Sequence, residues 1–167
     1  YDLITWTFDP LESRNAYSNL SKLYAISDTY LENYYGEMED GLNKVLPSDR
    51  LQIEWWFLSE RVERKWMPQI SKYVRPFAVG QSENGNPTIE VEPRETHLNR
   101  VGIEVPVPTH FQMLKKNEPE LALDWRMKIR TIFQTLFSAG YAVVGLRKTD
   151  EEVQYYQFVK RSTIPLN

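Results

Sequence analysis

The sequence contains no cysteine, no long apolar run and no excess of positive charge. Without cysteine the chain has no disulfide, no thiolate nucleophile and no cysteine-rich metal site, which fits a reducing, cytoplasmic setting. No run approaches the roughly 20 apolar residues that span a membrane, so we expect no membrane partner. The formal net charge of −3 gives no electrostatic footprint for nucleic acid, so we expect no nucleic-acid partner.

Two further absences concern catalytic motifs. No two of the seven glycines are separated by a single residue, so the chain has no Gly-x-Gly turn, no Walker loop and no Rossmann fingerprint. It also lacks the Gly-x-Ser-x-Gly motif of a serine nucleophile. The two histidines, His97 and His110, stand in unrelated contexts without an acidic motif beside them, so we predict no metal site.

What the chain does contain is apolar and aromatic material for a core. Hydrophobic residues make up 41% of its 167 residues and aromatic residues 13%, which suits one good core or two small cores that share an interface. The chain opens at Tyr1 directly before a strand-like pattern. We therefore expect these residues to be the C-terminal portion of a longer protein.

The most informative stretch is the first 23 residues. Leu3–Phe8 is apolar and rich in strand-forming residues, which predicts a buried strand. Asp9-Pro10 breaks the extended pattern, and Arg14–Leu23 has helical spacing with an apolar stripe. A strand that enters a helix through a polar turn is a common place for an anionic ligand, although this geometry names no reaction.

The remaining patterns predict an α+β fold with a mixed, mainly antiparallel sheet and packed helices. Gly36–Gly41 is polar and is predicted to be a loop that acts as a lid, and Pro106 and Pro108 are expected to end the strand before them. Alternating or apolar runs predict strands at Leu51–Leu58, Val74–Val79, Thr88–Val91, Val101–Val105, Tyr141–Arg147 and Val153–Lys160.

Helical periodicity predicts three further helices. Ser59 caps the first, which is expected to reach about Tyr73 unless Pro68 kinks or stops it. The second is a short helix at 110–116. The longest is 118–139, with Pro119 in its first turn and Gly140 directly after its end.

The opening stretch also carries a family resemblance. The run FDPLESRNAYSNLSKL has Asp-Pro-Leu after the strand and an Asn-Ala-x-x-Asn-x-x-Lys-Leu helix, and it resembles a largely uncharacterised group within the GNAT acyltransferase superfamily. The stretch from Ile103 to Lys160 resembles the C-terminal end of the same group, whereas Tyr24 stands where the group usually has glycine. The resemblance implies the C-terminal half of a GNAT fold, with residues 1–58 in the acyltransferase core and residues 59–167 as an α+β extension.

The resemblance further implies acetyl-CoA or another acyl-CoA as cosubstrate. In this superfamily a late strand splays open, and the helix after it lies beside the pantetheine and thiol of acyl-CoA. A tyrosine near the thiolate in many members falls at about Asn19 here, and the usual Gly-x-Gly pyrophosphate clamp is expected upstream of Tyr1. The helix would then contact the cofactor through the amides and cations of Arg14, Asn15, Asn19 and Lys22. The alternative is that these side chains form a capped, solvent-exposed helix face without a ligand.

Side chains elsewhere supply candidates for catalysis and substrate binding. The general base is not readable from the sequence, and Tyr34 and Glu54 are the two candidates. Tyr30, Tyr34 and Tyr35, beside Asn33, are predicted to line a substrate pocket, and the alternative is a set of half-buried aromatic residues at a sheet edge.

Two arginines on the long helix form a further candidate. Arg126 and Arg130 are four residues apart and therefore project from one helix face. They would form a fork for a carboxylate or phosphate of the substrate, and the alternative is a pair of surface arginines with acidic neighbours.

These observations lead to two hypotheses from different classes. The first is an acyl-CoA-dependent N-acyltransferase that transfers an acetyl or other short acyl group to a small-molecule amine. The second is a non-catalytic α+β module for interaction or substrate recognition. Either hypothesis is compatible with a homo-oligomer of this chain.

Overall fold

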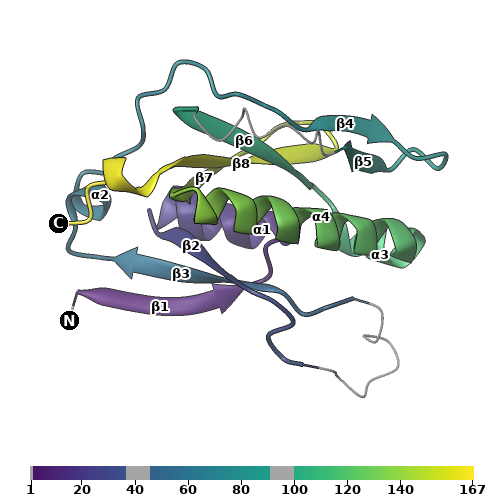
Figure 1. The fold of residues 1–167 in the computed structure, drawn as a ribbon, viewed down its shortest axis with the longest axis horizontal. Coiled ribbons are helices and arrows are strands. Elements are labelled where there is room, and N and C mark those ends of the chain that lie inside the picture. Colours follow the sequence, from purple (N-terminus) through teal and green to yellow (C-terminus); the bar gives the residue numbers. More distant parts are fainter. Residues whose placement is uncertain (1, 37–45, 91–99) are drawn as a thin grey trace.

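The computed structural model describes residues 2–36, 46–90 and 100–167, and within them the chain folds as an α+β protein (Figure 1). Six strands form one sheet in the order β1-β3-β2-β7-β8-β6, with every neighbouring pair antiparallel, and β4 and β5 form a separate hairpin. The predicted fold class is confirmed. The strands are β1 Leu3–Phe8, β2 Ile26–Leu31, β3 Arg50–Trp56, β4 Ala78–Gln81, β5 Pro87–Glu90, β6 Gly102–Pro108, β7 Tyr141–Arg147 and β8 Val153–Lys160.

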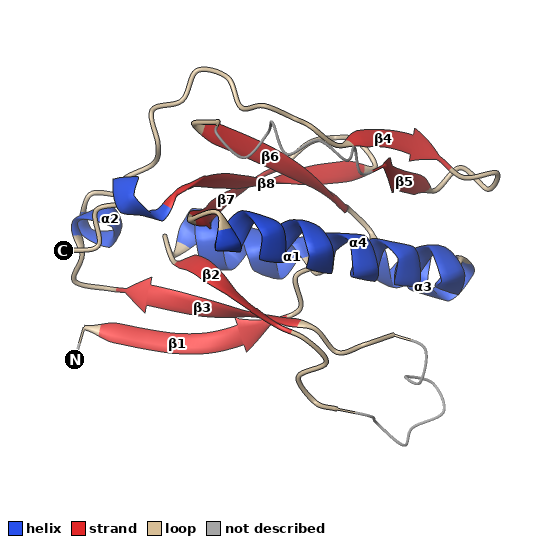
Figure 2. Cartoon of the chain, viewed as in Figure 1, coloured by secondary structure: helices blue, strands red, loops and turns tan. Residues whose placement is uncertain are grey.

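The helices differ greatly in length (Figure 2). The longest, α4 (Pro119–Ser138), confirms the predicted helix, and Gly140 follows it with a φ of +90°, a conformation that ends helices. In Figure 1, α4 crosses the sheet with β6 and β8 above it and β3 and β1 below it. The short helices are α1 Ser13–Ala16, which continues directly into the π-helical turn η1 Tyr17–Lys22, then α2 Glu60–Glu63, α3 Phe111–Asn117 and the 3₁₀ turn η3 Arg161–Thr163.

One aromatic cluster joins α4 to strands from both ends of the chain. The ring of Phe133 lies 6.0 Å from that of Tyr30 on β2, 5.0 Å from Tyr156 and 4.9 Å from Phe158 on β8, all in edge-to-face geometry. Strands β1, β2 and β3 come from residues 1–58 and strands β6, β7 and β8 from residues 59–167, so the two segments share one core and one sheet. The domain boundary near residue 58 stays a prediction.

The sheet opens at the seam between its two halves. Within the described residues, β2 and β7 share a single residue pair, Ser27 with Val143. Past this pair, side chains replace the missing strand contacts: the Ser21 hydroxyl accepts a hydrogen bond from the Leu146 N–H at 2.9 Å, and an Arg61 guanidinium nitrogen donates to the Val144 carbonyl at 2.7 Å. The end of helix η1 and the start of α2 therefore close the seam.

Three sequence predictions of element ends were wrong. Strand β4 spans Ala78–Gln81 rather than Val74–Val79. Helix α2 ends at Glu63 rather than near Tyr73, because the chain turns at Lys65, which has a φ of +53°. Strand β6 continues through Pro106 and Pro108. Glu104, two residues before Pro106, directs its N–H away from β8 to the Val74 carbonyl, so the prolines occupy positions where the ladder to β8 needs no N–H.

The predicted lid lies mostly outside the described residues. Of Gly36–Gly41, the structure describes Gly36 alone, and His97 is also outside.

Candidate functional site

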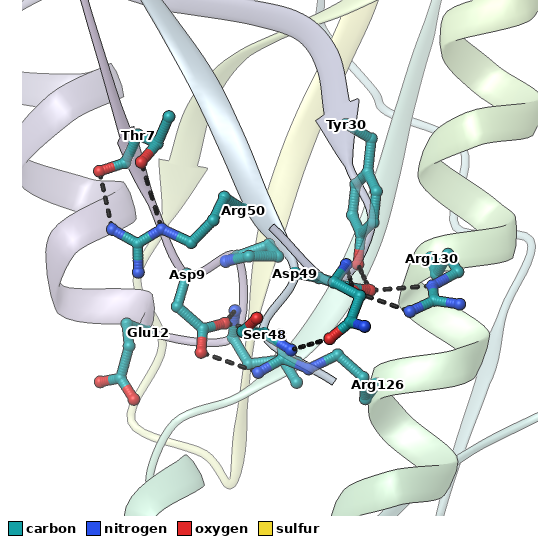
Figure 3. A network of polar contacts seen from close by, with 12 residues as sticks. Thr7, Asp9, Glu12, Tyr30, Ser48, Asp49, Arg50, Arg126 and Arg130 are labelled. Atoms are coloured by element: carbon teal, nitrogen blue, oxygen red, sulfur yellow. Dashed lines mark hydrogen bonds and ion pairs between the residues drawn. The ribbon is translucent and has the colours of Figure 1, made fainter. Parts of the chain in front are cut away.

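Two aspartates and two arginines meet where β1 ends and β3 begins (Figure 3). Asp9 directly follows β1 and Asp49 directly precedes β3, and because these strands are antiparallel neighbours, both aspartates lie at the same end of the sheet. Arg126 and Arg130 reach them from α4. Arg126 binds both Asp9 carboxylate oxygens at 2.7 Å, and Arg130 binds the two oxygens of Asp49 at 2.9 and 2.7 Å.

Asp49 is the centre of this network. Its side chain is completely buried, and it also accepts hydrogen bonds from the Tyr30 hydroxyl at 2.7 Å and the Asn33 backbone N–H at 2.8 Å. Burial alone would raise the pKa of Asp49, but the hydrogen bonds from Arg130, Asn33 and Tyr30 outweigh it and lower that pKa below 3.8. Burial and the bond to Asp49 raise the pKa of Tyr30 far above its ordinary value, so its hydroxyl stays protonated.

The geometry engages both arginines of the predicted substrate fork in internal ion pairs. Arg126 is 2% exposed, and its Nε is the one buried side-chain polar atom of the described residues without a hydrogen-bond partner. Arg130 has a further contact to Glu32 at 3.7 Å. A substrate carboxylate would have to displace Asp9 or Asp49, so the network acts first as a clamp that holds β1 and β3 to α4.

The predicted pocket residues Asn33, Tyr34 and Tyr35 lie together in the turn after β2. The Tyr34 N–H donates to the Ser48 carbonyl at 2.9 Å, and the Tyr35 N–H donates to the Ser48 hydroxyl at 3.0 Å. The two tyrosine rings are 5.1 Å apart and more than half exposed, and the Arg50 guanidinium lies 5.6 Å from the Tyr35 ring. These residues form an exposed aromatic rim tied to the Asp49 network.

Glu54, one of the two candidate bases, lies at a different place on β3. Its carboxylate accepts bonds from Arg161 at 2.8 and 2.9 Å and from the Trp56 indole N–H at 2.9 Å. Burial acts to raise the pKa of Glu54, but the bonds from Arg161 and Trp56 lower it overall. A carboxylate held in this way is a weak base, and no described contact joins it to Tyr34.

The predicted cofactor residues lie on the helix formed by α1 and η1. Arg14 and Asn15 are exposed, and no described residue forms a hydrogen bond or ion pair with either side chain. Asn19 accepts a hydrogen bond from the Trp6 indole N–H on β1 at 3.3 Å, so its side-chain amide N–H groups remain available to a ligand. The helix therefore carries the Asn19 amide on the side facing β1 and the exposed polar side chains of Arg14 and Asn15 near its start.

The π-helical turn changes which side chains of this helix are neighbours. The Leu23 N–H donates to the Ser18 carbonyl five residues earlier, the bond that defines this geometry. With this winding, the Lys22 ammonium lies 5.7 Å from the centre of the Tyr17 ring. Lys148, directly after β7, places its ammonium 3.8 Å from the same ring centre.

A buried arginine anchors the C-terminal end of the helix. Arg61 is fully buried and donates to the carbonyls of Leu20, Tyr24 and Ala25 at 3.3, 2.9 and 3.1 Å. Burial lowers the pKa of Arg61 to about 10, and the guanidinium stays charged at neutral pH. Tyr24, where the resembling group has glycine, adopts a φ of +60°, the conformation glycine tolerates best.

The structure thus separates the predicted site residues into three places: the helix face, the turn after β2 with the α4 network, and the Glu54–Arg161 pair. Lys148 and Arg61 were missed by sequence reasoning. Both act through contacts with residues far away in the chain, and no local pattern marks them. Asp9 and Asp49, the partners of the arginines, are marked only by their places at strand ends.

No family model matches the chain, and neither a curated protein nor a solved structure matches it significantly. Within the described residues, no group of three or more histidines and carboxylates is placed to hold a metal ion. None of the described helices combines the length and apolar character needed to cross a membrane.

Proposed function

We propose that this chain binds an acyl-CoA on the α1–η1 helix and serves an N-acyltransferase of the GNAT type. The observation that carries the proposal is the π-helical turn after β1, which presents the Asn19 amide and the Lys22 ammonium without a carboxylate partner among the described residues. Isolated π-helical turns are rare and occur frequently at functional sites.

The chemistry of this face suits the parts of a CoA molecule. Amide N–H groups such as those of Asn19 and Asn15 bind the carbonyl oxygens of pantetheine, and Arg14 and Lys22 bind phosphate. The resemblance of residues 8–23 to the GNAT helix supports the same assignment. Transfer of an acetyl or other short acyl group to a small-molecule amine follows from that resemblance.

The reaction would be attack of a neutral amine on the thioester carbonyl, with loss of the ammonium proton to a base. Most of the catalytic effect would come from positioning the amine and polarising the carbonyl. Of the two candidate bases, Tyr34 is exposed, whereas Glu54 is committed to Arg161. Tyr34 is therefore the better candidate, with Asn33 and Tyr35 beside it as substrate contacts.

Isothermal titration of the protein with acetyl-CoA and succinyl-CoA tests the proposal. We expect binding that Asn19→Ala weakens by up to about tenfold, the effect of losing one hydrogen bond to a neutral carbonyl. Asn117→Ala, on the exposed end of α3, is the matched control and should bind as the unaltered protein does. Equal binding by both variants would remove Asn19 from the site, and absence of any heat would reject the proposal for this chain.

The second candidate function is a non-catalytic recognition module. It is favoured by the internal ion pairs of Glu54, Arg126 and Arg130, which engage three of the groups suggested for chemistry. This candidate predicts no heat with any acyl-CoA, so the same titration separates the two functions.

A further inference from the structure

Two lysines from distant parts of the chain meet at one aromatic ring. Lys22 ends helix η1, and Lys148 follows β7 more than a hundred residues later. Both ammonium nitrogens lie within 5.7 Å of the centre of the Tyr17 ring. The half-buried Tyr17 ring thus brings together two positive charges that lie far apart in the sequence.

This pair has no counter-charge in the described part of the chain. No described carboxylate forms an ion pair with Lys22 or Lys148. Four arginines on or against the sheet are, by contrast, paired with carboxylates: Arg126 with Asp9, Arg130 with Asp49, Arg147 with Glu104 and Arg161 with Glu54. Two cations gathered at one ring without an ion-pair partner would both attract an anion that reaches them.

The helix dipole explains only half of the arrangement. A cation at the C-terminal end of a helix is stabilised by the dipole, which accounts for Lys22 in the last turn of η1. It does not account for Lys148, which belongs to the connection after β7. Contact with the Tyr17 ring is a weak attraction at an exposed site and leaves the ammonium donors available.

Hydrogen bonds hold together the two backbone segments that carry Lys22 and Lys148. The hydroxyl of Ser21, next to Lys22, is hydrogen-bonded to both the N–H and the carbonyl of Leu146, two residues before Lys148. Arg61 binds the carbonyls of Leu20 and Val144 and so ties the same two segments together. The separation of the two lysine backbones is therefore fixed by these bonds, and a ligand has to order only the two exposed lysine side chains.

We propose that Lys22 and Lys148, gathered at Tyr17, bind a phosphate group of the acyl-CoA, which makes the connection after β7 part of the cofactor site. This inference rests on the proposed function, since it names which part of the acyl-CoA meets this end of the helix. The ligand chemistry is a phosphate monoester or diphosphate, and CoA contains both.

The test is titration calorimetry with CoA and dephospho-CoA, which lacks the 3′-phosphate. Lys148→Gln should weaken CoA binding about tenfold, and Lys148→Arg should largely restore it. Lys116→Gln, on an exposed face of α3, is the matched control and should change nothing. Between 50 and 200 mM salt, CoA affinity should fall more for the unaltered protein than for a Lys22→Gln/Lys148→Gln double variant.

The loss of affinity for CoA compared with that for dephospho-CoA identifies which phosphate group the lysine pair binds. If Lys148→Gln weakens CoA alone and makes it equal to dephospho-CoA, the pair binds the 3′-phosphate; if it weakens both ligands equally, the pair binds the diphosphate. CoA binding that Lys148→Gln leaves unaltered would overturn the inference while the proposed function stands.

Failure of the proposed function gives a different result. If the chain binds no CoA, titration with inorganic pyrophosphate followed by NMR decides the anion site by itself. Shifts confined to Tyr17, Lys22 and Lys148 would support the lysine pair as an anion site, and no shifts would reject it.

Discussion

Replacing Asp49 with asparagine should destabilise the protein more than any exposed charge substitution. The carboxylate of Asp49 is fully buried and binds two nitrogens of Arg130, the Tyr30 hydroxyl and the Asn33 N–H. Asparagine keeps the shape but removes the charge, and its NH₂ group must face one of these donors. Arg130, whose side chain is 16% exposed, then loses its closest counter-ion.

The size of the effect follows from burial. Breaking a buried ion pair by neutralising one partner costs about 3–5 kcal/mol. Because Arg130 keeps partial access to water and a second, longer contact to Glu32, we take the lower end, about 3 kcal/mol. For a chain of this size that corresponds to a fall in Tm of about 6–12 °C.

The same pair predicts a pH dependence with a definite sign. The folded-state pKa of Asp49 lies below 3.8, the value expected in the unfolded chain, so the unfolded state binds more protons in this range. The stabilisation by Asp49 is therefore fully present above that value and is lost as the pH falls through the folded-state pKa. Since Asp49→Asn lacks this contribution, the stability difference between the two proteins should narrow as the pH falls below about 4.

Urea denaturation followed by tryptophan fluorescence measures both effects. The matched control is Asp124→Asn, which breaks the half-exposed pair of Asp124 with Lys128 and should change the free energy of unfolding by less than about 1 kcal/mol. If Asp49→Asn costs no more than this control, the network is not the clamp described above. A stability difference that is the same at pH 7 and pH 3 would also refute the reasoning.

Three other substitutions test the fold. Arg61→Met leaves at least three buried carbonyls without a donor and should lower the free energy of unfolding by about 3 kcal/mol or more in urea, whereas Arg64→Met, at an exposed position, should not. Phe133→Ala empties the centre of the aromatic cluster and should cost about 3–5 kcal/mol; a cost below 1 kcal/mol would contradict that placement. Gly140→Ala, at a φ of +90°, should cost about 1–2 kcal/mol in thermal melts, and an unchanged Tm would show that the helix end relaxes.

The lysine pair and the π-helical turn lie at the same end of the first helix, where the two halves of the sheet meet. If both bind acyl-CoA, the segment after β7 contributes to a site that the sequence assigns to the first helix alone. The two halves of the sheet would then meet at their seam for a functional as well as a structural reason.

The fold class and the strongest elements were predictable from local patterns. The 118–139 periodicity and the 141–160 hairpin each contain enough apolar residues in a regular spacing to specify their own structure, and both were confirmed. The ends of α2 and β6 were not predictable, because a backbone turn at Lys65 and the open edge beside Pro106 depend on what lies next to the chain in space.

Composition and spacing establish which residue types are available for a site: amides and cations on the helix after β1, arginines four apart on α4, and no cysteine, Gly-x-Gly turn or histidine cluster. The tertiary structure sets the partners of these residues. It committed Arg126 and Arg130 to Asp9 and Asp49, because antiparallel pairing of β1 with β3 brings both aspartates to the sheet end that α4 crosses. It also brought Lys148 to Tyr17, since charge pairing depends on distance in space, which no local pattern encodes.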